Sequence, residues 1–290
     1  MVFTHSRHLV KTILASRFRS LLLLAVVAPF CFGGLNAKAN LLTVFPEMGD
    51  LLRWAAFSGA GGVTATDTLD AFSGTTDIFG DVGIAGDGDL TLSGGATIHG
   101  NLYYKTGGTL KKNGNAMVTG TTFHDGASDT QLNNGVNEAI ATANHAFGLF
   151  ATRPQMSIIL GDHQNLTLTG APGETVVLQL SNFSLSASAT LTLQGSANTN
   201  FVINVSNQFS LTGGSKIVLD GVSWDDVLFN VVNTGSDVKV SGQSTLNGVL
   251  MANKRTVELS GGSLVNGEVI ADRIKMSGSS EINHPAVTSD

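Results

Sequence analysis

The chain has 290 residues, of which 42% are hydrophobic and only 13% are charged, whereas a typical soluble domain carries about 25% charged residues. Glycine is abundant, with 35 residues against 5 prolines, and the formal net charge is −6. This composition excludes a coiled coil, a collagen helix and a charge-rich disordered chain. The acidic balance argues against a nucleic-acid partner, which requires a basic surface.

Residues 1–39 have the features of a secretory signal peptide. Basic residues come first, an apolar stretch follows over 21–35, and a small-x-small motif closes the segment at 37–39. An uncleaved anchor fits less well, because the apolar stretch is short and interrupted by proline and glycine. The single cysteine, Cys31, lies in this segment. We therefore expect a secreted or cell-surface protein without disulfides and, after cleavage, without a membrane span.

The rest of the chain repeats itself, with three different periods. The first array has a period of 20 residues, the second, from Phe183, a period of 26, and the third a period of 19. A constant period places equivalent residues on neighbouring coils. The predicted vertical neighbours are Ile78, Ile98 and Val118 in the first array, and Val240 with Leu259 and Leu250 with Val269 in the third.

Within each unit, short stretches alternate apolar and polar residues, and glycine, asparagine, aspartate and serine separate them. This alternation is typical of β-strands joined by turns. Units of about 20 residues that contain several short strands indicate a β-solenoid. A β-sandwich is the competing interpretation, but it does not explain repeats that keep their register residue for residue.

Two segments break the strand pattern. Between residues 129 and 152, apolar side chains recur every three or four positions, which predicts a helix that packs on the flank of the solenoid. The side chains expected to be buried there are Leu132, Val136, Ile140, Ala143 and Phe147. A shorter helix over 46–57 is expected to cap the first coil. The predicted organisation is a signal peptide over 1–39, an N-terminal cap over 40–75 and a solenoid over 76–290.

The C-terminal half resembles the choice-of-anchor A family of bacterial surface adhesins. The likeness rests on residues 200–206, 227–230, 246–252, 265–271 and 281–284. It implies an all-β fold, a right-handed parallel β-helix, and a role in adhesion. The order of parts, with a first coil over 58–84 and a long helix beside the coils, is also similar to the ice-binding β-solenoids of bacteria and fungi.

No residue pattern indicates catalysis or a cofactor. The acidic pairs Asp87 with Asp89 and Asp225 with Asp226 lie beside turn residues, where aspartate usually bonds its own backbone, and no lysine or arginine recurs beside them at the coil period. The stretch 86–89 is similar to a calcium-binding turn but occurs once, whereas such repeats need several copies. No histidine spacing is typical of a metal site. We assign no catalytic, cofactor or metal residue.

Asn247 and Asn266 are one 19-residue period apart, and this spacing predicts stacked amides. We interpret them as a ladder that holds a turn rather than as a binding stripe.

Outward side chains of the coils are the candidate binding residues. One recurring motif places an outward residue between two apolar ones, and its uncharged members Thr91, Thr167 and Ser210 form the predicted binding face. The same motif position is charged in Lys239, Glu258 and Lys275.

The sequence thus predicts a non-enzymatic solenoid that adheres to an extracellular surface, matrix or glycan. Ice binding through a flat face is the alternative, and cleavage of a polysaccharide is the third hypothesis.

Overall fold

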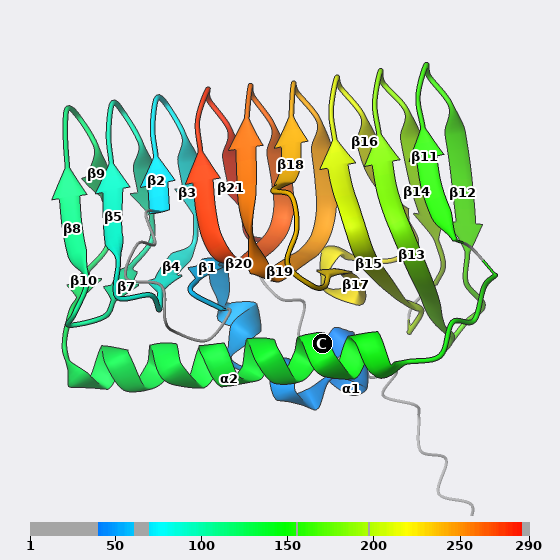
Figure 1. The fold of residues 1–290 in the computed structure, drawn as a ribbon, viewed down its shortest axis with the longest axis horizontal. Helices are drawn as coiled ribbons and strands as arrows, with labels where there is room; N and C mark the ends of the chain where they lie inside the picture. Colours follow the sequence, from blue (N-terminus) through cyan, green and yellow to red (C-terminus); the bar gives the residue numbers. More distant parts are fainter. Residues whose placement is uncertain (1–39, 61–69, 155, 197, 286–290) are drawn as a thin grey trace, which may run out of the picture. The chain divides into compact units, whose positions relative to one another are not determined.

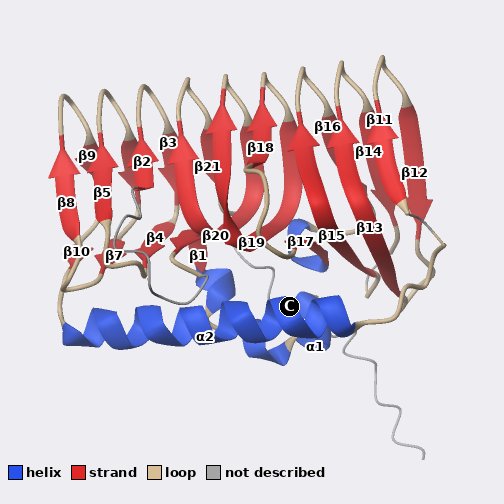
Figure 2. Cartoon of the chain, viewed as in Figure 1, coloured by secondary structure: helices blue, strands red, loops and turns tan. Residues whose placement is uncertain are grey.

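The computed structural model describes residues 40–60, 70–154, 156–196 and 198–285. These residues form a β-solenoid of parallel strands with one long helix beside it (Figures 1 and 2). The predicted all-β coil with a flanking helix is confirmed. In this part of the chain, no helix is both long enough and apolar enough to cross a membrane.

The coil has three faces, which we name A, B and C. Face A contains, from one end of the solenoid to the other, β9 (Met117–Val118), β6 (Thr97–His99), β3 (Asp77–Phe79), β21 (Glu281–Asn283), the first residues of β20 (Leu264–Met276) and of β19 (Thr245–Ser260), β16 (Lys216–Asp220), β14 (Thr190–Gln194) and β12 (Asn165–Thr169).

Faces B and C follow the same order of coils. Face B contains β10 (Thr122–Phe123), β7 (Leu102–Tyr104), β4 (Asp81–Ile84), β1 (Trp54–Ser58), the middle of β20 and of β19, β17 (Val227–Val231), and the first halves of β15 (Asn200–Leu211) and β13 (Thr175–Leu185). Face C contains β8 (Thr109–Lys112), β5 (Asp89–Leu92), β2 (Asp70–Phe72), the ends of β20 and β19, β18 (Val238–Ser241), the ends of β15 and β13, and β11 (Ser157–Leu160).

The strand register confirms the predicted stacks. Equivalent residues are paired on adjacent parallel strands: Ile78 with Ile98, Ile98 with Val118, Val240 with Leu259, and Leu250 with Val269. The repeat periods therefore predicted correctly which residues are neighbours on adjacent coils.

The coils do not stack in chain order, and the sequence patterns did not predict this. The last strands of the chain pair with the first ones: β20 pairs with β1 and β2, and β21 pairs with β3. The N-terminal array, from β1 to β10, therefore continues the C-terminal array, from β11 to β21, as one solenoid. The chain passes from one end of this solenoid to the other along the helix (Figure 1).

The helix predicted over 46–57 is wrong. Residues 41–53 form a short helix and two 3-10 turns, α1 (Leu41–Val44), η1 (Pro46–Met48) and η2 (Leu51–Arg53), and β1 follows directly. Every residue of β1 is buried, because one side of the strand faces the coil interior and the other lies beneath the helix layer. The strand pairs on both sides, with β4 and β20, so there is no open first coil for residues 41–53 to cap. The segment predicted as an N-terminal cap, 40–75, thus contributes two solenoid strands, β1 and β2.

The long helix, α2 (Gly126–Gly148), lies where predicted on the flank of face B (Figure 1). Asp125 caps its start by accepting the Ser128 N–H at 2.8 Å. Leu132, Val136 and Ala143 are buried as expected, and Ile140 is half-buried.

The expected burial of Phe147 is wrong, because its side chain is 49% exposed. Near its C-terminal end, α2 packs against face B through buried alanines. Asn230 and Asn204 on face B donate their side-chain N–H groups to the carbonyls of Ala143 and Ala146, at 3.0 and 2.8 Å. These bonds hold the helix backbone close to the sheet and leave Phe147 outside.

A second apolar core fills the space between face B and the layer formed by α2 and residues 41–53. Gly135 shows how close the layers are: a Cβ at this position would lie 2.7 Å from the Phe57 ring. Glycine inside a helix costs about 1 kcal/mol relative to alanine, and here the close approach requires it.

Glu268 on β20 is buried in this second layer. It is fully buried, and neither carboxylate oxygen has a hydrogen-bond partner among the described residues. Burial, together with the nearby charge of Glu138 on α2, raises the pKa of Glu268 well above its usual value. The folded protein therefore holds this carboxyl in its neutral form over a pH range in which the unfolded chain ionises it.

We expect Leu132→Ala to destabilise the protein by about 2–5 kcal/mol, because Leu132 is fully buried beneath α2. Phe147→Ala on the same helix serves as the control and should cost about 1 kcal/mol or less, since half of that side chain is in water. Denaturant unfolding of both variants measures the difference. Equal losses would mean that the buried face of α2 is assigned wrongly.

We also expect the stability of the protein to fall as the pH rises from the usual pKa of a glutamate towards the raised pKa of Glu268. In this window the unfolded chain has released the proton and the folded chain retains it, so folding requires proton uptake. Glu268→Gln should flatten this part of the curve of melting temperature against pH, and should be more stable than the wild type at the alkaline end. Glu281→Gln, which removes a carboxylate from face A, should leave the curve unchanged in shape.

Candidate binding faces

Face B is not available to a large partner. The helix α2 and residues 41–53 cover it, and its outward side chains, such as Phe57, Val202 and Ile270, are buried in the second core. The exposed surfaces of the solenoid are therefore faces A and C, together with the outer side of α2.

The predicted binding residues do not lie on one face. Thr91 and Ser210 occupy the same outward row of face C, but they are not adjacent, since four residues separate them along the row: Ala71, Lys275, Glu258 and Lys239. Thr167 lies on β12 of face A. The expectation of a single face is therefore wrong. The shared motif recurs on two sides of the coil, and a motif of five residues does not identify the side.

Face C carries alternating charges. Lys239 and Glu258 approach to 3.9 Å across neighbouring strands, and Lys275 follows Glu258 in the same row. Lys111 bonds Asp89 on the next coil and lowers the pKa of that carboxyl. The register partner of Asp89 is Thr109, while Lys111 stands opposite Thr91, so this ion pair is diagonal. The expectation that no lysine recurs beside Asp89 at the coil period agrees with this register.

The outward row of face C thus contains three successive charged residues in its middle, with small uncharged residues on both sides, and at one end the Ser184 and Ser210 hydroxyls bond each other at 3.1 Å. Face C is therefore chemically uneven.

Face A is less charged over one continuous half. On β12 and β14, threonines stand in cross-strand register, Thr167 beside Thr192. Val218 on β16 follows in the same row. Between β12 and β16 the outward residues are Asn165, Thr167, Thr169, Thr190, Thr192, Gln194, Lys216, Val218 and Asp220. Only the two ends of β16 carry charge, so hydroxyl, methyl and amide groups form most of this surface.

Side-chain hydrogen bonds hold one border of this surface. The hydroxyl of Thr169 donates to the Gln194 Oε1 at 3.3 Å, and the Gln194 Nε2 donates to the Asp220 Oδ2 at 2.8 Å. Three successive coils are linked in this way. The Asp220 carboxylate is therefore part of a chain of bonds across the face.

The predicted asparagine ladder is confirmed on the adjoining coils of face A. Asn266 donates to the Asn247 Oδ1 at 2.9 Å, and Asn283 donates to the Asn266 Oδ1 at 3.3 Å. Asn247 in turn donates to the carbonyl of Ile217 at 2.6 Å. The amides bond one another from coil to coil, which fixes their orientation and keeps the surface flat.

Beyond the ladder, the character of face A changes. Phe79 and His99 stack with ring centroids 4.4 Å apart, and His99 bonds Asp77 at 2.9 Å. Glu281 stands beside Asp77 on the next strand. The low-charge part of face A, which we call the threonine surface, is therefore limited to β12, β14, β16 and the first residues of β19 and β20.

The Asp225 and Asp226 pair has a structural role, as the sequence indicated. Both side chains are buried in the 3-10 turn η3 (Trp224–Asp226). The Asp226 Oδ2 accepts the Ser223 N–H at 2.7 Å and forms a capping box with it. This pair stabilises a turn and lies outside both exposed faces.

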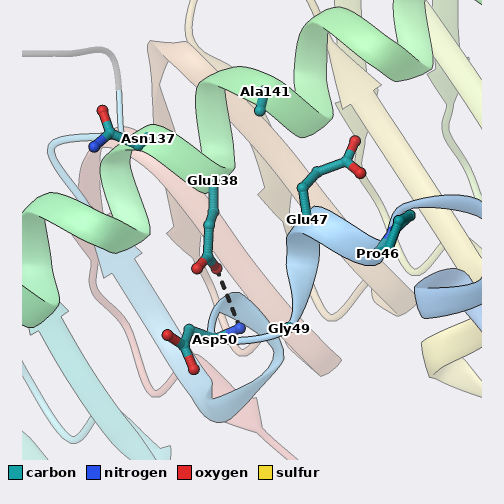
Figure 3. A pocket seen from close by; sticks show the side chains of 7 residues that line it. All are labelled: Pro46, Glu47, Gly49, Asp50, Asn137, Glu138 and Ala141. Atoms are coloured by element: carbon teal, nitrogen blue, oxygen red, sulfur yellow. Dashed lines mark hydrogen bonds between the residues drawn. The ribbon is translucent and has the colours of Figure 1, made fainter.

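One groove lies between α2 and the N-terminal segment (Figure 3). It has a volume of about 500 Å³ and is lined by Pro46, Glu47, Gly49, Asp50, Asn137, Glu138 and Ala141. The Glu138 carboxylate accepts the Asp50 N–H at 3.1 Å, and burial together with the Asp50 charge raises the pKa of Glu138.

In the described ranges, no group of three or more histidine, cysteine, aspartate or glutamate side chains is placed to hold a metal ion.

Comparison with solved structures gives the same fold. A glycosylated ice-binding protein from an Arctic yeast (LeIBP) matches with a TM-score of 0.53 at 17% identity, covering 88% of this chain and 96% of that one. An ice-binding protein from an Antarctic bacterium of the Flavobacteriaceae matches with a TM-score of 0.55 at 20% identity, covering 83% of this chain and 48% of that one. An ice-binding protein domain from Shewanella frigidimarina matches with a TM-score of 0.50 at 13% identity, covering 83% and 97% of the two chains.

No curated protein sequence matches this chain. A family model described as "Putative Ice-binding-like adhesive domain" matches residues 54–284, a range that starts at β1 and ends just after β21 and so contains every solenoid strand described above. The chain therefore belongs to this ice-binding-like adhesive family.

Proposed function

We propose that the protein is an exported adhesive that binds an extended extracellular surface through the threonine surface of face A. The observation that carries this proposal is the combination of a threonine pair in cross-strand register with hydrogen-bonded side chains at the border of the same surface. Thr167 and Thr192 stand in register, and the Thr169, Gln194 and Asp220 side chains are already bonded to one another.

Binding by such a face comes from many weak contacts. Side chains that are fixed before contact lose little conformational entropy when the target binds, so more of the interaction energy remains as affinity. Parallel strands repeat at about 4.8 Å, so the five strands of the threonine surface give a length of about 20 Å. A target with a regular, weakly charged surface, such as a glycan or a cell-surface polymer, suits this arrangement.

Ice is the second candidate target. The specific observation that favours it is the pairing of Thr167 with Thr192, because each threonine presents a methyl and a hydroxyl group at the strand spacing. The structural neighbours are described as ice-binding proteins, and their likeness to this chain is a likeness of fold. Adhesion and ice binding use the same surface in this proposal.

Export and adhesion also have support in the sequence. Residues 1–39 have the pattern of a signal peptide, and the C-terminal half resembles the choice-of-anchor A adhesins. A non-enzymatic role agrees with the positions of the acidic residues, since Asp89 is bonded to Lys111 and Asp225 is buried in a turn. Polysaccharide cleavage therefore remains the third hypothesis.

We expect Thr192→Tyr to reduce target binding at least tenfold, because a large side chain in the middle of the threonine surface keeps a flat target away from several coils. Ser210→Tyr is the matched control, since Ser210 is a small outward residue on face C. Binding is measured to immobilised glycans and intact cells, and ice binding by thermal hysteresis and recrystallisation assays.

A loss confined to the face A variant supports the proposal, and the assay that shows it distinguishes adhesion from ice binding. A loss of binding confined to Ser210→Tyr would show that face C, and not face A, binds the target. If the wild type binds none of these targets, the proposed function is wrong.

We expect no release of new reducing ends when the purified protein is incubated with a panel of polysaccharides. Removal of one general acid from an enzyme costs about 10²–10⁴ in rate. Turnover by the wild type that disappears in Asp89→Asn or Asp87→Asn, while the folded state is retained, would show that the protein is an enzyme.

A further inference from the structure

The solenoid has two ends at which strands have a neighbour on one side only. Among the residues that the structure describes, β12 pairs with β14 alone and β11 pairs with β13 alone. At the opposite end, β8, β9 and β10 pair only with the preceding coil. An exposed edge strand presents unpaired N–H and C=O groups, which pair readily with another strand unless the edge is protected.

The end formed by β8, β9 and β10 is protected in two ways. Both β9 and β10 contain two residues only. On β8, Lys112 stands in register with Leu92 and Phe72, two buried core residues of the coils before it. Short edge strands and inward-pointing charges are established means of preventing edge-to-edge association.

The strand β12 at the other end is neither short nor interrupted by an inward charge. One of its edge groups, the carbonyl of Thr169, accepts a hydrogen bond from the Arg153 guanidinium at 3.3 Å, and a partner strand would have to replace this bond. Its five residues, Asn165–Thr169, alternate threonine outside with leucine inside and include no charge and no proline. It pairs with β14 residue for residue, without a bulge. Leu166 and Leu168 are only half-buried, whereas their partners one coil further in, Leu191 and Leu193, are fully buried. Leu166 and Leu168 are less buried because no further coil packs against them.

The surroundings of β12 are also apolar and nearly uncharged. Phe150, Met156 and Ile159 are largely exposed at this end of the solenoid. Arg153 and Glu174 neutralise each other in an ion pair of 2.7 Å. The remaining polar side chains of this kind, Asp162 and His163, lie in the turn between β11 and β12 and approach each other to 3.6 Å.

We propose that two copies of this chain associate through β12, with the two strands antiparallel about a two-fold axis at Thr167. A second β12 supplies backbone partners and apolar cover to this edge. In this arrangement Leu166 lies opposite Leu168 of the other copy, and every threonine remains outside. The charges also favour this partner, since stacking on the opposite end of another copy would bury Lys112 against leucines. A two-fold contact closes on itself, so it yields a dimer and not a filament.

The two-fold axis is normal to face A, so the threonine surfaces of the two copies would form one continuous sheet. This consequence rests on the proposed function, whereas the dimer itself does not. Light scattering reports the mass without any target, so failure of the dimer and failure of the proposed binding are distinguishable.

The first test is the mass of the purified protein over a wide range of concentration. We expect a dimer for the wild type and for Thr192→Lys, which places a charge on face A one strand away from the edge. Leu166→Lys, which places a charge at the inward side of the edge, should be a monomer with the circular dichroism spectrum of the wild type. A wild type that is monomeric at every concentration overturns the proposal, as does a dimer that Leu166→Lys leaves intact.

The second test does not depend on a destabilising change. In a Cys31→Ser background, Thr167→Cys should form an intermolecular disulfide under mild oxidation, because antiparallel partners have Cα atoms about 4.5–5.5 Å apart, within reach of a disulfide. Thr192→Cys lies one strand further from the axis and should remain reduced. Equal crosslinking of the two variants, or none in either, contradicts pairing through β12.

Discussion

The pairing of the end of the chain with its beginning is the interaction on which the solenoid depends. Because β20 pairs with β1 and β2, and β21 with β3, the two arrays share one continuous interior core. Without this junction each array would have a further open edge. The junction also determines the course of α2, since the chain must travel the length of the solenoid before the second array begins at the far end (Figure 1).

The path of α2 in turn decides which surfaces are free. The helix occupies face B, where Asn204 and Asn230 bind its carbonyls, and this leaves two faces that differ in charge. In a solenoid, equivalent outward positions of successive coils form a row. A small difference in the residue types at such a position therefore changes the chemistry of a large part of the face. Between β12 and β20 the outward groups of face A are mostly threonines and amides, some of which bond one another, whereas on β18, β19 and β20 of face C lysines alternate with a glutamate.

The sequence predicted the parts of this architecture that follow from local pattern. Periods of 20, 26 and 19 residues paired the correct neighbours, such as Ile78 with Ile98, since the period counts residues per coil. The stacking of the last coil on the first was not predictable in this way, because no period links residue 282 to residue 78. The error at 46–57 has a similar origin: the apolar residues of β1 are buried on both sides, which removes the alternation typical of a strand. Thr167 was correctly identified as outward, but its face could not be read, since the three sides of a coil share one short motif.

Regularity of the coils underlies both the proposed binding surface and the open edge at β12. Thr167 and Thr192 stand in register on face A, and the same alternation of outward and inward residues at the terminal strand makes an edge that another strand can extend. The two ends of the solenoid differ. At one end Lys112 terminates a core column of face C, whereas at the other end that column terminates in Leu160 and the face A columns terminate in Leu166 and Leu168. A charge at the second end would lie beneath the threonines that form the proposed binding surface. Lys112 lies on face C at the opposite end, remote from these threonines, so its charge protects that edge without entering the proposed binding surface.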